Sequence, residues 1–362
     1  MLRELSDTYE VIALSSPDSD LSETGEREKV RTIPVMMKRK ISPLYDLRSL
    51  FSLIRVFRRE KPYMVHSMTP KAGLLSMMAA YLTGVPVRLH SFTGLVFPTS
   101  SGVKRKILMM TDRLTCLFAS HILAEGEGVR HDLMDNGITK KKINILGYGN
   151  MRGIDLEYFD RTEEIVKKIY DIREKLKVEK DTFVFVFVGR LNHDKGIDEL
   201  IFSFRNLVKE GYDIRLLLVG EEEICDPLLP ETSEYINNSP LVLKTGWIKD
   251  VRPYYAAADS LVFPSHREGF PNVVIEAGAM GLPSIVTDIN GSREIILNEV
   301  NGIIIPSNDS DSLMKAMKRF IENREVVKKL ASTSRKLIAD RFEQSFVRSN
   351  LKEYYHEILN EP

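Results

Sequence analysis

The sequence predicts an α/β protein made of two domains, each an open parallel sheet covered by helices. Short apolar runs alternate along the chain with amphipathic segments of helical period, which is the pattern of strands joined by crossover helices. These runs are continuous rather than alternating, as in strands that are buried on both faces. The length of 362 residues is enough for two domains of ordinary size.

The composition is that of a soluble globular protein, with 43% hydrophobic and 28% charged residues. The formal net charge of zero argues against a dedicated nucleic-acid binder. Cys116 and Cys225 lie in different predicted domains, so we expect no disulfide framework and no cysteine-based metal site, and a cytosolic compartment is favoured. The polar start Leu2–Asp7 does not have the pattern of a signal peptide, and no run reaches the roughly 20 apolar residues that span a bilayer.

The first predicted domain covers residues 1–152. Ser42 and Pro43 indicate a helix start, because proline favours the first turn, and apolar residues at helical spacing follow them. Further helices are expected from Pro70, Gly102 and Gly126. The expected strands are Tyr9–Ser15, Val30–Pro34, Met64–Ser67, Val87–His90, His121–Ala124 and Ile143–Leu146.

The second predicted domain covers residues 153–340 and follows a linker at Gly149–Asp155. Phe183–Val188 is an uninterrupted run of β-branched and aromatic residues, which predicts a central strand. The other expected strands are Ile214–Val219, Leu241–Thr245, Ser260–Pro264 and Ser284–Thr287. The expected helices are Glu163–Lys177, Ile197–Val208, Asp250–Ala258, one capped by Asp309 or Ser310, Glu325–Asp340 and Gln344–Leu359.

A loop and a helix between two of these strands have the features of an anion site. Gly269 permits unusual φ angles, and Pro271 with Asn272 marks a helix start whose free N–H groups favour phosphate. Glu268 and Glu276 flank that position. Two carboxylates beside an anion site fit a ligand with phosphates in the middle and hydroxyl-bearing rings on both sides, which is the chemistry of a nucleotide-sugar.

Glu268, seven intervening residues and Glu276, within Glu-Gly-Phe-Pro-Asn, resemble the signature of glycosyltransferase family 4. The spacing alone also occurs on solvated helices, and the flanking Gly-Phe-Pro and Gly-Leu-Pro sequences make the resemblance specific. It implies the GT-B fold, two Rossmann-like domains facing across a cleft, with residues 341–362 as a helix that returns to the first domain. It also implies retaining, metal-independent transfer, with Glu268 beside the donor sugar and Glu276 on the ribose.

Arg190 and Lys195 follow the predicted central strand, close to a helix start where positive charge is unfavourable. They are either solvated or ligands of an anion, and the resemblance assigns both to the diphosphate, which arginine clamps bidentately. Trp247 either walls the base pocket or packs internally. The further residues expected to bind the substrate in this domain are Gly189, Gly269, Phe270, Pro271, Asn272, Val273 and Ile248.

Three candidates lie in the first domain. His90 ends a predicted strand ahead of Thr93 and Gly94; a lone histidine is more often structural, but the resemblance implies contact with the donor sugar. We therefore expect His90 to act with Glu268, Arg190 and Lys195 in catalysis, and Thr93 and Gly94 to bind substrate. Lys71, at a helix start, is expected to meet an acceptor phosphate.

The acidic triplets and the basic triplets of the sequence each allow two interpretations. Asp18–Asp20 and Asp309–Asp311 resemble a metal-binding triplet, but they lie in a Ser/Pro turn and at a helix cap, so we expect no metal and no cofactor. The basic triplets Lys38–Lys40, Lys104–Lys106 and Lys140–Lys142 are either solvated or attracted to an anionic membrane. The hypothesis is a cytoplasmic enzyme, peripheral on the inner face of the cell membrane, that uses a lipid-linked acceptor.

Family members open with a strand and a glycine-bearing loop that this sequence does not show before Leu5, so we expect a neighbouring strand with unpaired backbone groups. Phe92–Phe97 and Gly147–Leu156 resemble the polysaccharide-assembly subgroup. The expected function is transfer of a hexose or N-acetylhexosamine from a UDP-sugar in capsule, O-antigen or exopolysaccharide biosynthesis. The alternatives are a catalytically impaired nucleotide-sugar-binding protein or partner subunit, and another GT-B enzyme such as an epimerase, whose carboxylate and histidine set is not visible here.

Overall fold

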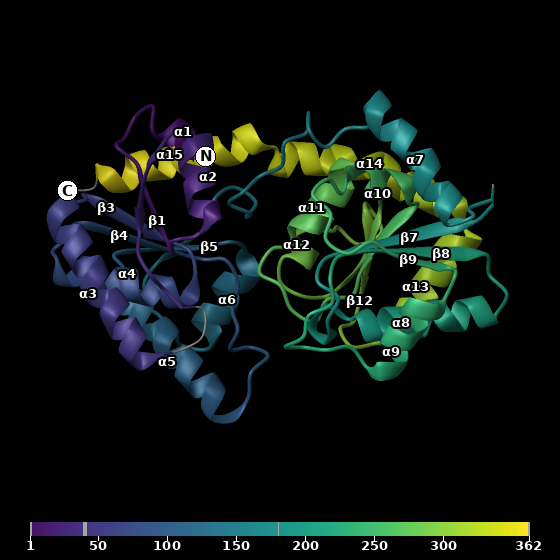
Figure 1. Ribbon diagram of the computed structural model, residues 1–362, viewed down its shortest axis with the longest axis horizontal. Helices are drawn as coiled ribbons and strands as arrows, with labels where there is room; N and C mark the ends of the chain where they lie inside the picture. The colour runs from purple at the N-terminus through teal and green to yellow at the C-terminus, as the bar shows by residue number, and fades with distance from the viewer. Residues whose placement is uncertain (1, 39–41, 180, 361–362) are drawn as a thin grey trace. The chain divides into compact units, whose positions relative to one another are not determined.

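The computed structural model describes residues 2–38, 42–179 and 181–360. The chain forms two compact units, drawn in Figure 1. Unit 1 comprises residues 1–147 and 347–362, and unit 2 comprises residues 148–346. Residues 148–152, which the sequence placed in the first domain, thus belong to unit 2, and the chain passes back to unit 1 at Val347 rather than at residue 341.

Unit 2 is built on a six-stranded parallel sheet in the order β12-β11-β10-β7-β8-β9. The predicted central strand, β7 (Phe183–Val188), pairs on both sides and is buried along its whole length because helices cover both faces of the sheet. The sequence did not predict β12, a short edge strand that pairs with β11. The other strands are β8 (Ile214–Val219), β9 (Val242–Lys244), β10 (Ser260–Phe263), β11 (Ser284–Thr287) and β12 (Gly302–Ile305).

Helices cover both faces of this sheet. Figure 1 shows α7, α10, α11 and α14 over one face and α8, α9 and α13 over the other. The sequence analysis missed α9, which begins at Pro230. The helices of unit 2 are α7 (Glu163–Lys175), the 3₁₀ turn η1 (His193–Lys195), α8 (Ile197–Lys209), α9 (Pro230–Asn238), α10 (Arg252–Ala257), α11 (Asn272–Ala279), α12 (Ser292–Ile295), α13 (Ser310–Glu322) and α14 (Arg324–Phe342).

Unit 1 contains two separate parallel sheets. One pairs β1 (Ile12–Ser15) with β2 (Arg31–Pro34), and the other has the order β3-β4-β5-β6. Among the residues that the structure describes, β1 pairs with β2 alone. The strands of the second sheet are β3 (Met64–Ser67), β4 (Val87–Phe92), β5 (His121–Ala124) and β6 (Ile143–Asn144).

The helices of unit 1 include one that the sequence analysis read as a turn. Asp18 lies not in a Ser/Pro turn but at the N-cap of α2, where its carboxylate accepts from the Leu21 N–H at 3.0 Å. Among the described residues, none of the helices of the protein combines the length and the apolar character needed to cross a membrane. The helices of this unit are α1 (Leu2–Leu5), α2 (Ser19–Glu28), α3 (Pro43–Glu60), α4 (Pro70–Leu82), α5 (Gly102–Phe118), α6 (Glu127–Asp135) and most of α15 (Gln344–Leu359).

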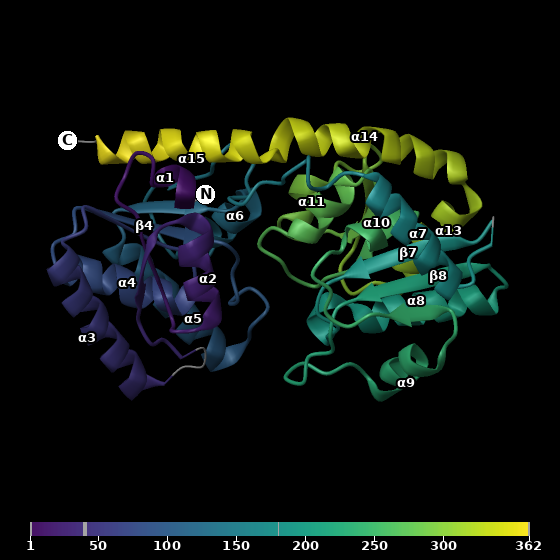
Figure 2. The same cartoon turned by 45° about the horizontal axis from the view of Figure 1, so that its top comes forward.

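The C-terminal helix packs on unit 1 through both polar and apolar contacts. Tyr355 Oη lies 2.5 Å from His66 Nδ1, and Asn144 Nδ2 donates to Tyr354 Oη at 3.0 Å. Arg348 forms an ion pair with Glu4, which joins α15 to α1. The ribbons of these two helices lie side by side in Figure 2. These contacts explain why a segment so late in the sequence belongs to the first unit.

Candidate active site

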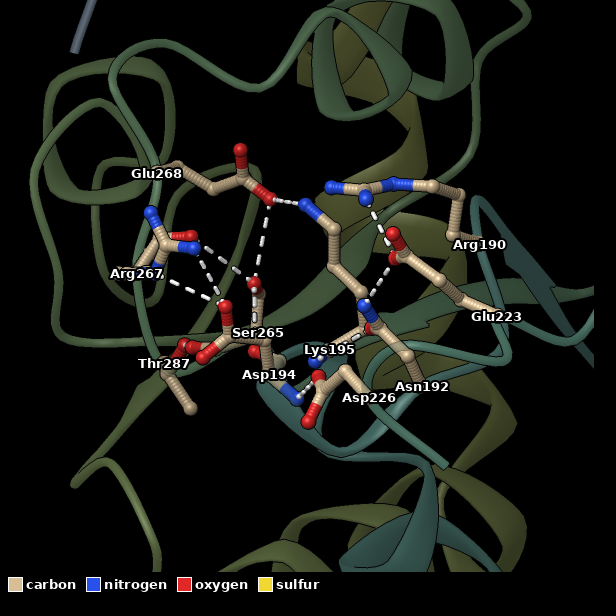
Figure 3. A network of polar contacts seen from close by, with 10 residues as sticks. All are labelled: Arg190, Asn192, Asp194, Lys195, Glu223, Asp226, Ser265, Arg267, Glu268 and Thr287. Atoms are coloured by element: carbon tan, nitrogen blue, oxygen red, sulfur yellow. Dashed lines mark hydrogen bonds and ion pairs between the residues drawn. The ribbon is translucent and has the colours of Figure 1, made fainter. Parts of the chain in front are cut away.

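A network of polar side chains lies at the carboxyl ends of the strands of unit 2 (Figure 3). Parallel strands bring their carboxyl ends to one edge of a sheet, where α/β proteins bind ligands. The loop after β7 supplies Arg190 to Lys195, and the loop after β10 supplies Ser265 to Glu268. Glu223 and Asp226 come from the segment after β8. The network thus unites segments that are far apart in the sequence.

Lys195 and Glu268, both predicted site residues, form an ion pair in this network. Their side chains point toward one another in Figure 3, and only 14% and 17% of the two side chains is exposed. Ser265 Oγ donates to the same carboxylate at 3.1 Å. Thr287, at the end of β11, donates to the carbonyl oxygen of Ser265 and so fixes the loop that bears Glu268.

Arg190 forms a second ion pair, with Glu223. Asn192 Nδ2 donates to the same Glu223 carboxylate at 2.8 Å, while its Oδ1 caps η1 by accepting from the Lys195 N–H at 3.2 Å. The sequence analysis missed Glu223. Its only local signal is the acidic run that follows Gly220.

Two glycines let the loops that bear these residues approach each other. Gly189 has a φ of 148° and Gly220 a φ of 151°, in the region that favours glycine. A Cβ atom on Gly220 would lie 1.8 Å from the Gly189 carbonyl oxygen, so no other residue fits there without moving the backbone. The close approach brings Glu223 within reach of Arg190.

A third pair, which the sequence analysis also missed, joins the two main loops. Arg267 donates to Asp194 Oδ2 from Nε at 2.9 Å and from Nη2 at 2.5 Å, and the Asp194 N–H donates to Asp226 at 2.9 Å. Burial raises the pKa of Asp194, but the hydrogen bonds from Arg267 and its charge outweigh burial and leave the pKa below its usual value. Asp194 is therefore ionised at neutral pH and holds the two loops together.

Glu276 lies on α11, one helical turn beyond the start of the helix at Asn272. Burial raises the pKa of its carboxyl, against opposing effects of the Arg152 charge and the hydrogen bond from Tyr255. The Tyr255 hydroxyl donates to Glu276 Oε2 at 3.2 Å, and Arg152 Nη1 lies 3.6 Å from Oε1. Arg152 and Tyr255 were not predicted as site residues.

The loop that leads into α11 is held by close packing. Phe270 is buried and packs edge-on against Phe342, with ring centroids 5.6 Å apart. A Cβ atom on Gly291 would lie 2.5 Å from the Gly269 carbonyl oxygen, so this glycine is required where the two loops meet. Pro271 precedes the helix, and the first-turn N–H groups at Asn272 and Val273 are those that an α-helix leaves for other acceptors.

Near β9, Ile248 packs partly buried against the core of unit 2, whereas Trp247 is 70% exposed. The exposed indole excludes the internal-packing interpretation of Trp247. That Trp247 lies beside the base of the nucleotide stays a prediction.

The candidates of unit 1 lie in different surroundings. His90 is only 1% exposed, with Ser67 Oγ 2.8 Å from its Nδ1 and the Phe92 ring edge-on at 4.5 Å. Burial, with a smaller effect of His66, lowers the pKa of His90 to about 3. The imidazole is therefore neutral and covered by its own unit, and its contact with a sugar stays a prediction.

The other unit 1 candidates are tied to neighbouring backbone or charge. Lys71 forms an ion pair with Asp46 and donates to the Lys38 carbonyl at 2.7 Å. Thr93 is exposed and donates to the Met68 carbonyl at 3.3 Å, while Gly94, the next residue, adopts a φ of 145°. The contact of Lys71 with an acceptor phosphate, and those of Thr93 and Gly94 with substrate, stay predictions.

Neither acidic triplet forms a metal cluster in the part of the chain that the structure describes. Asp309 caps α13 by accepting from the Ser312 N–H at 2.9 Å, as expected from the sequence, and Asp18 caps α2. Both carboxylates therefore have a structural role.

Unit 2 thus has a six-stranded parallel sheet, an arginine and a lysine after its central strand, and two glutamates around the start of α11. These features define the nucleotide-binding half of a sugar transferase of the GT-B type. Residues 168–337 match the family model described as glycosyl transferases group 1, and residues 1–149 match that of a glycosyl transferase 4-like domain. The chain belongs to this glycosyltransferase family and is a glycosyltransferase.

Two relatives agree with this assignment, and a solved structure has the same fold. The capsular polysaccharide biosynthesis glycosyltransferase CapM of Staphylococcus aureus is 32% identical over 97% of this chain and 91% of its own. The Escherichia coli UDP-Gal:alpha-D-GlcNAc-diphosphoundecaprenol alpha-1,3-galactosyltransferase is 31% identical over 79% of this chain and 73% of its own. The crystal structure of HepE of Anabaena with UDP and glucose has a TM-score of 0.79 at 18% identity, covering 98% of this chain and 94% of that one, and shows the same fold.

Proposed function

We propose that this glycosyltransferase transfers a hexose or N-acetylhexosamine, with retention, from a UDP-sugar to a lipid-diphosphate-linked saccharide in surface-polysaccharide assembly. One observation carries the proposal: Lys195, Glu268 and Arg190 converge at the carboxyl edge of the sheet of unit 2. The names of the relatives support it, since one assembles capsule and the other uses a diphosphoundecaprenol acceptor. Glu276, on the same unit, is the partner proposed for the ribose.

The leaving group explains why this arrangement suits the reaction. Cleavage of the bond between the anomeric carbon and the phosphate oxygen leaves negative charge on the nucleoside diphosphate. Arg190, Lys195 and the N–H groups at the start of α11 are the groups that would stabilise this charge as it develops. Removal of one such donor in other enzymes raises the barrier by roughly 3–4 kcal/mol. A bound metal is not required for this step in the proposed mechanism.

The pairs seen in the structure also assign a role to Glu268. When Lys195 turns to the diphosphate, the Glu268 carboxylate is released and can accept hydrogen bonds from the hydroxyls of the donor sugar. We favour a front-face route in which the departing phosphate oxygen takes the proton of the acceptor hydroxyl. A covalent route through Glu268 would retain configuration as well.

Uridine diphosphate release tests the proposal. The protein is incubated with UDP-sugars and a lipid-diphosphate GlcNAc or GalNAc acceptor, and free UDP is measured. Glu268→Ala and Arg190→Ala should abolish or strongly reduce release, whereas Glu325→Ala, at an exposed glutamate on α14, should not change it. Binding of UDP-sugar without release from any acceptor would favour the alternative of a catalytically impaired binding protein.

The surface of unit 1 supports the proposed place at the membrane. Exposed apolar side chains lie on the first halves of α3 and α5, and the N-terminal ends of these helices lie at the same end of unit 1 in Figures 1 and 2. Lys104 and Lys106 are exposed beside the apolar residues of α5. Apolar residues flanked by cations suit an anionic lipid surface. The exposed apolar residues are Leu44, Leu47 and Phe51 on α3 and Val103, Ile107 and Met110 on α5.

The basic triplets do not contribute equally to this surface. Lys141 donates to the carbonyl oxygens of Cys116 and Ala119 and so ties down the end of α5. Lys38 lies over the ring of Tyr45 at 3.3 Å, while the other two members of its triplet, Arg39 and Lys40, fall outside the described residues. The membrane proposal therefore rests mainly on α3 and α5.

Flotation with vesicles of phosphatidylcholine and phosphatidylglycerol at low salt tests this location. The protein should float with the anionic vesicles, and Lys104→Ser with Lys106→Ser should reduce the floated fraction. Absence of binding to anionic vesicles at low salt would contradict a peripheral location on the inner face of the membrane.

A further inference from the structure

A tight turn at residues 150–153 of unit 2 lies beside the start of α11. Asn150 is fully buried and has a φ of 58°, a left-handed conformation that asparagine tolerates. Its Oδ1 accepts from the N–H groups of Arg152 and Gly153 at 3.0 and 2.7 Å. Its Nδ2 donates to Asn272 Oδ1 at 3.0 Å. One side chain thus shapes the turn and joins it to the first residue of α11, which fixes the backbone of Arg152 at this helix.

Arg152 is the solvent-exposed partner of the Glu276 carboxylate. Tyr255, which is fully buried, holds Oε2 from the inside, and Arg152 Nη1 lies 3.6 Å from Oε1. The Arg152 side chain is 64% exposed, whereas that of Glu276 is only 11% exposed. The Arg152 ion pair is longer than a hydrogen bond and reaches solvent, so it is the contact of Glu276 that a ligand can replace.

The same arrangement occurs at the two cations that are predicted to bind the diphosphate. Arg190 pairs with Glu223 and Lys195 pairs with Glu268, so each cation that faces the predicted diphosphate position has a carboxylate partner. A helix rises 1.5 Å per residue, which places Glu276 about 6 Å along α11 from Asn272. An extended arginine side chain spans that distance, so Arg152 can reach from the carboxylate to the first-turn N–H groups.

We propose that Arg152 is a further cation for the donor diphosphate beside Arg190 and Lys195, paired with Glu276 in the absence of ligand and moved to the diphosphate when a ribose takes its place. The inference rests on the proposed function and adds a residue to it. A ribose that binds Glu276 must displace Arg152. A nucleoside gains nothing from the displaced cation, whereas a nucleoside diphosphate gains a charge-assisted contact with it. Arg152 thereby favours the diphosphate over the bare nucleoside.

A comparison of uridine with UDP separates these two effects. Affinities are measured by NMR titration and calorimetry for the wild-type protein, Arg152→Ala, Arg152→Lys and, as a matched exposed arginine of unit 2, Arg161→Ala. Arg152→Ala should weaken UDP binding about tenfold, the scale of one charge-assisted contact. It should leave uridine binding unchanged or tighter, because Glu276 is no longer paired with Arg152. Arg152→Lys should bind UDP with intermediate affinity, and Arg161→Ala should match the wild type.

Two results for Arg152→Ala would overturn the inference. Equal weakening of uridine and UDP by Arg152→Ala would show that Arg152 only supports the shape of the site. Unchanged UDP affinity would show that it never meets the diphosphate. If the wild-type protein binds no UDP, the proposed function fails together with the inference, whereas either of the first two results overturns the role of Arg152 alone. Circular dichroism and thermal unfolding confirm that the variants are folded.

Discussion

The sheets of the two units differ in continuity. In unit 2, β7 has a paired strand on each side and is buried throughout. In unit 1, the strands divide into a pair and a group of four, and β1 and β3 are half-exposed along most of their length. A continuous buried sheet fixes the ends of its strands, and the network of charge pairs at the candidate site lies at those ends in unit 2.

The polar groups of the two units differ in charge as well. Unit 2 has salt bridges at the carboxyl edge of its sheet, Arg190 with Glu223 and Lys195 with Glu268. Unit 1 encloses neutral histidines, because burial lowers the pKa of His66 to about 4 and that of His90 to about 3. The cations of unit 2 can exchange their carboxylate partners for an anionic ligand. The histidines of unit 1 are instead hydrogen-bonded within their own unit, to Ser67, Ser91 and Tyr355.

The largest difference between the two units is expected in the loss of stability when a buried leucine is shortened. Leu217 in β8 is fully buried between β7 and β9, whereas Leu14 in β1 is half-buried. Leu217→Ala should lower the free energy of unfolding by roughly 3–5 kcal/mol, and Leu14→Ala by only about 1 kcal/mol, because a cavity forms only at the enclosed site. Urea unfolding followed by fluorescence of Trp247, the single tryptophan of the chain, reports on unit 2 alone.

In this experiment, far-UV circular dichroism follows both units. Leu14→Ala should leave the midpoint of the tryptophan transition unchanged. An equal loss of stability from the two substitutions would remove the contrast between a continuous and a divided sheet.

A smaller effect, on activity, is expected when the salt bridge between Lys195 and Glu268 in unit 2 is removed. Glu268→Gln keeps the shape of the side chain but removes its charge, so Lys195 is no longer held by a carboxylate. UDP release should fall about a hundredfold, corresponding to one lost transition-state contact of roughly 2.7 kcal/mol. The Kd of UDP, measured by calorimetry, should not rise. A weaker affinity for UDP with normal turnover would show that Glu268 serves only to support the diphosphate site.

Acid should lower the free energy of unfolding of unit 1 more than that of unit 2, by about 2 kcal/mol. The folded-state pKa of His90, about 3, lies below the ordinary value of 6.5, so the unfolded chain takes up a proton first as the pH falls. The stability of unit 1 is therefore complete above pH 6.5 and decreases as the pH falls from 6.5 toward 3, by about 2 kcal/mol for His90 at pH 5. In unit 2, the hydrogen bond to Asp198 raises the pKa of His193, so its contribution is present at low pH and is lost as the pH rises through the raised value.

Hydrogen exchange at pH 7 and pH 5 distinguishes the units. After correction for the intrinsic effect of pH, amides of β4 and β5 should lose protection in acid, and those of β7 and β8 should lose less. In His90→Asn the acid effect on unit 1 should be smaller. Equal loss of protection in the two sheets would contradict a neutral buried His90.

The smallest effect is expected at the helix caps, where the two units are alike. Asp18 and Asp309 each accept a hydrogen bond from the first turn of a helix. Replacement of either by alanine should reduce stability by about 1 kcal/mol and leave UDP release unchanged. Treatment with EDTA should also leave UDP release unchanged under the proposed mechanism. Loss of activity on chelation, restored by a divalent cation, would contradict metal independence.

The local parts of the donor site were predictable from the sequence. Glu268 and Glu276 lie in one strand–loop–helix unit, and Arg190 and Lys195 lie directly after the predicted central strand, so strand ends alone place all four on one edge. The pairings were not predictable. Lys195 and Glu268 are 73 residues apart, and Arg190 and Glu223 are 33 residues apart, so no local pattern links them.

The sequence by itself determined the alternation of strands and helices, the class of enzyme and the residues around the start of α11, because these depend on order along the chain. The tertiary structure decided three further features: the burial of His90, the edge strand β12 and the place of Arg152 on Glu276. Burial and ion pairing depend on which segments meet in space. In unit 2 that is set by the order of strands in the sheet, which differs from their order in the sequence.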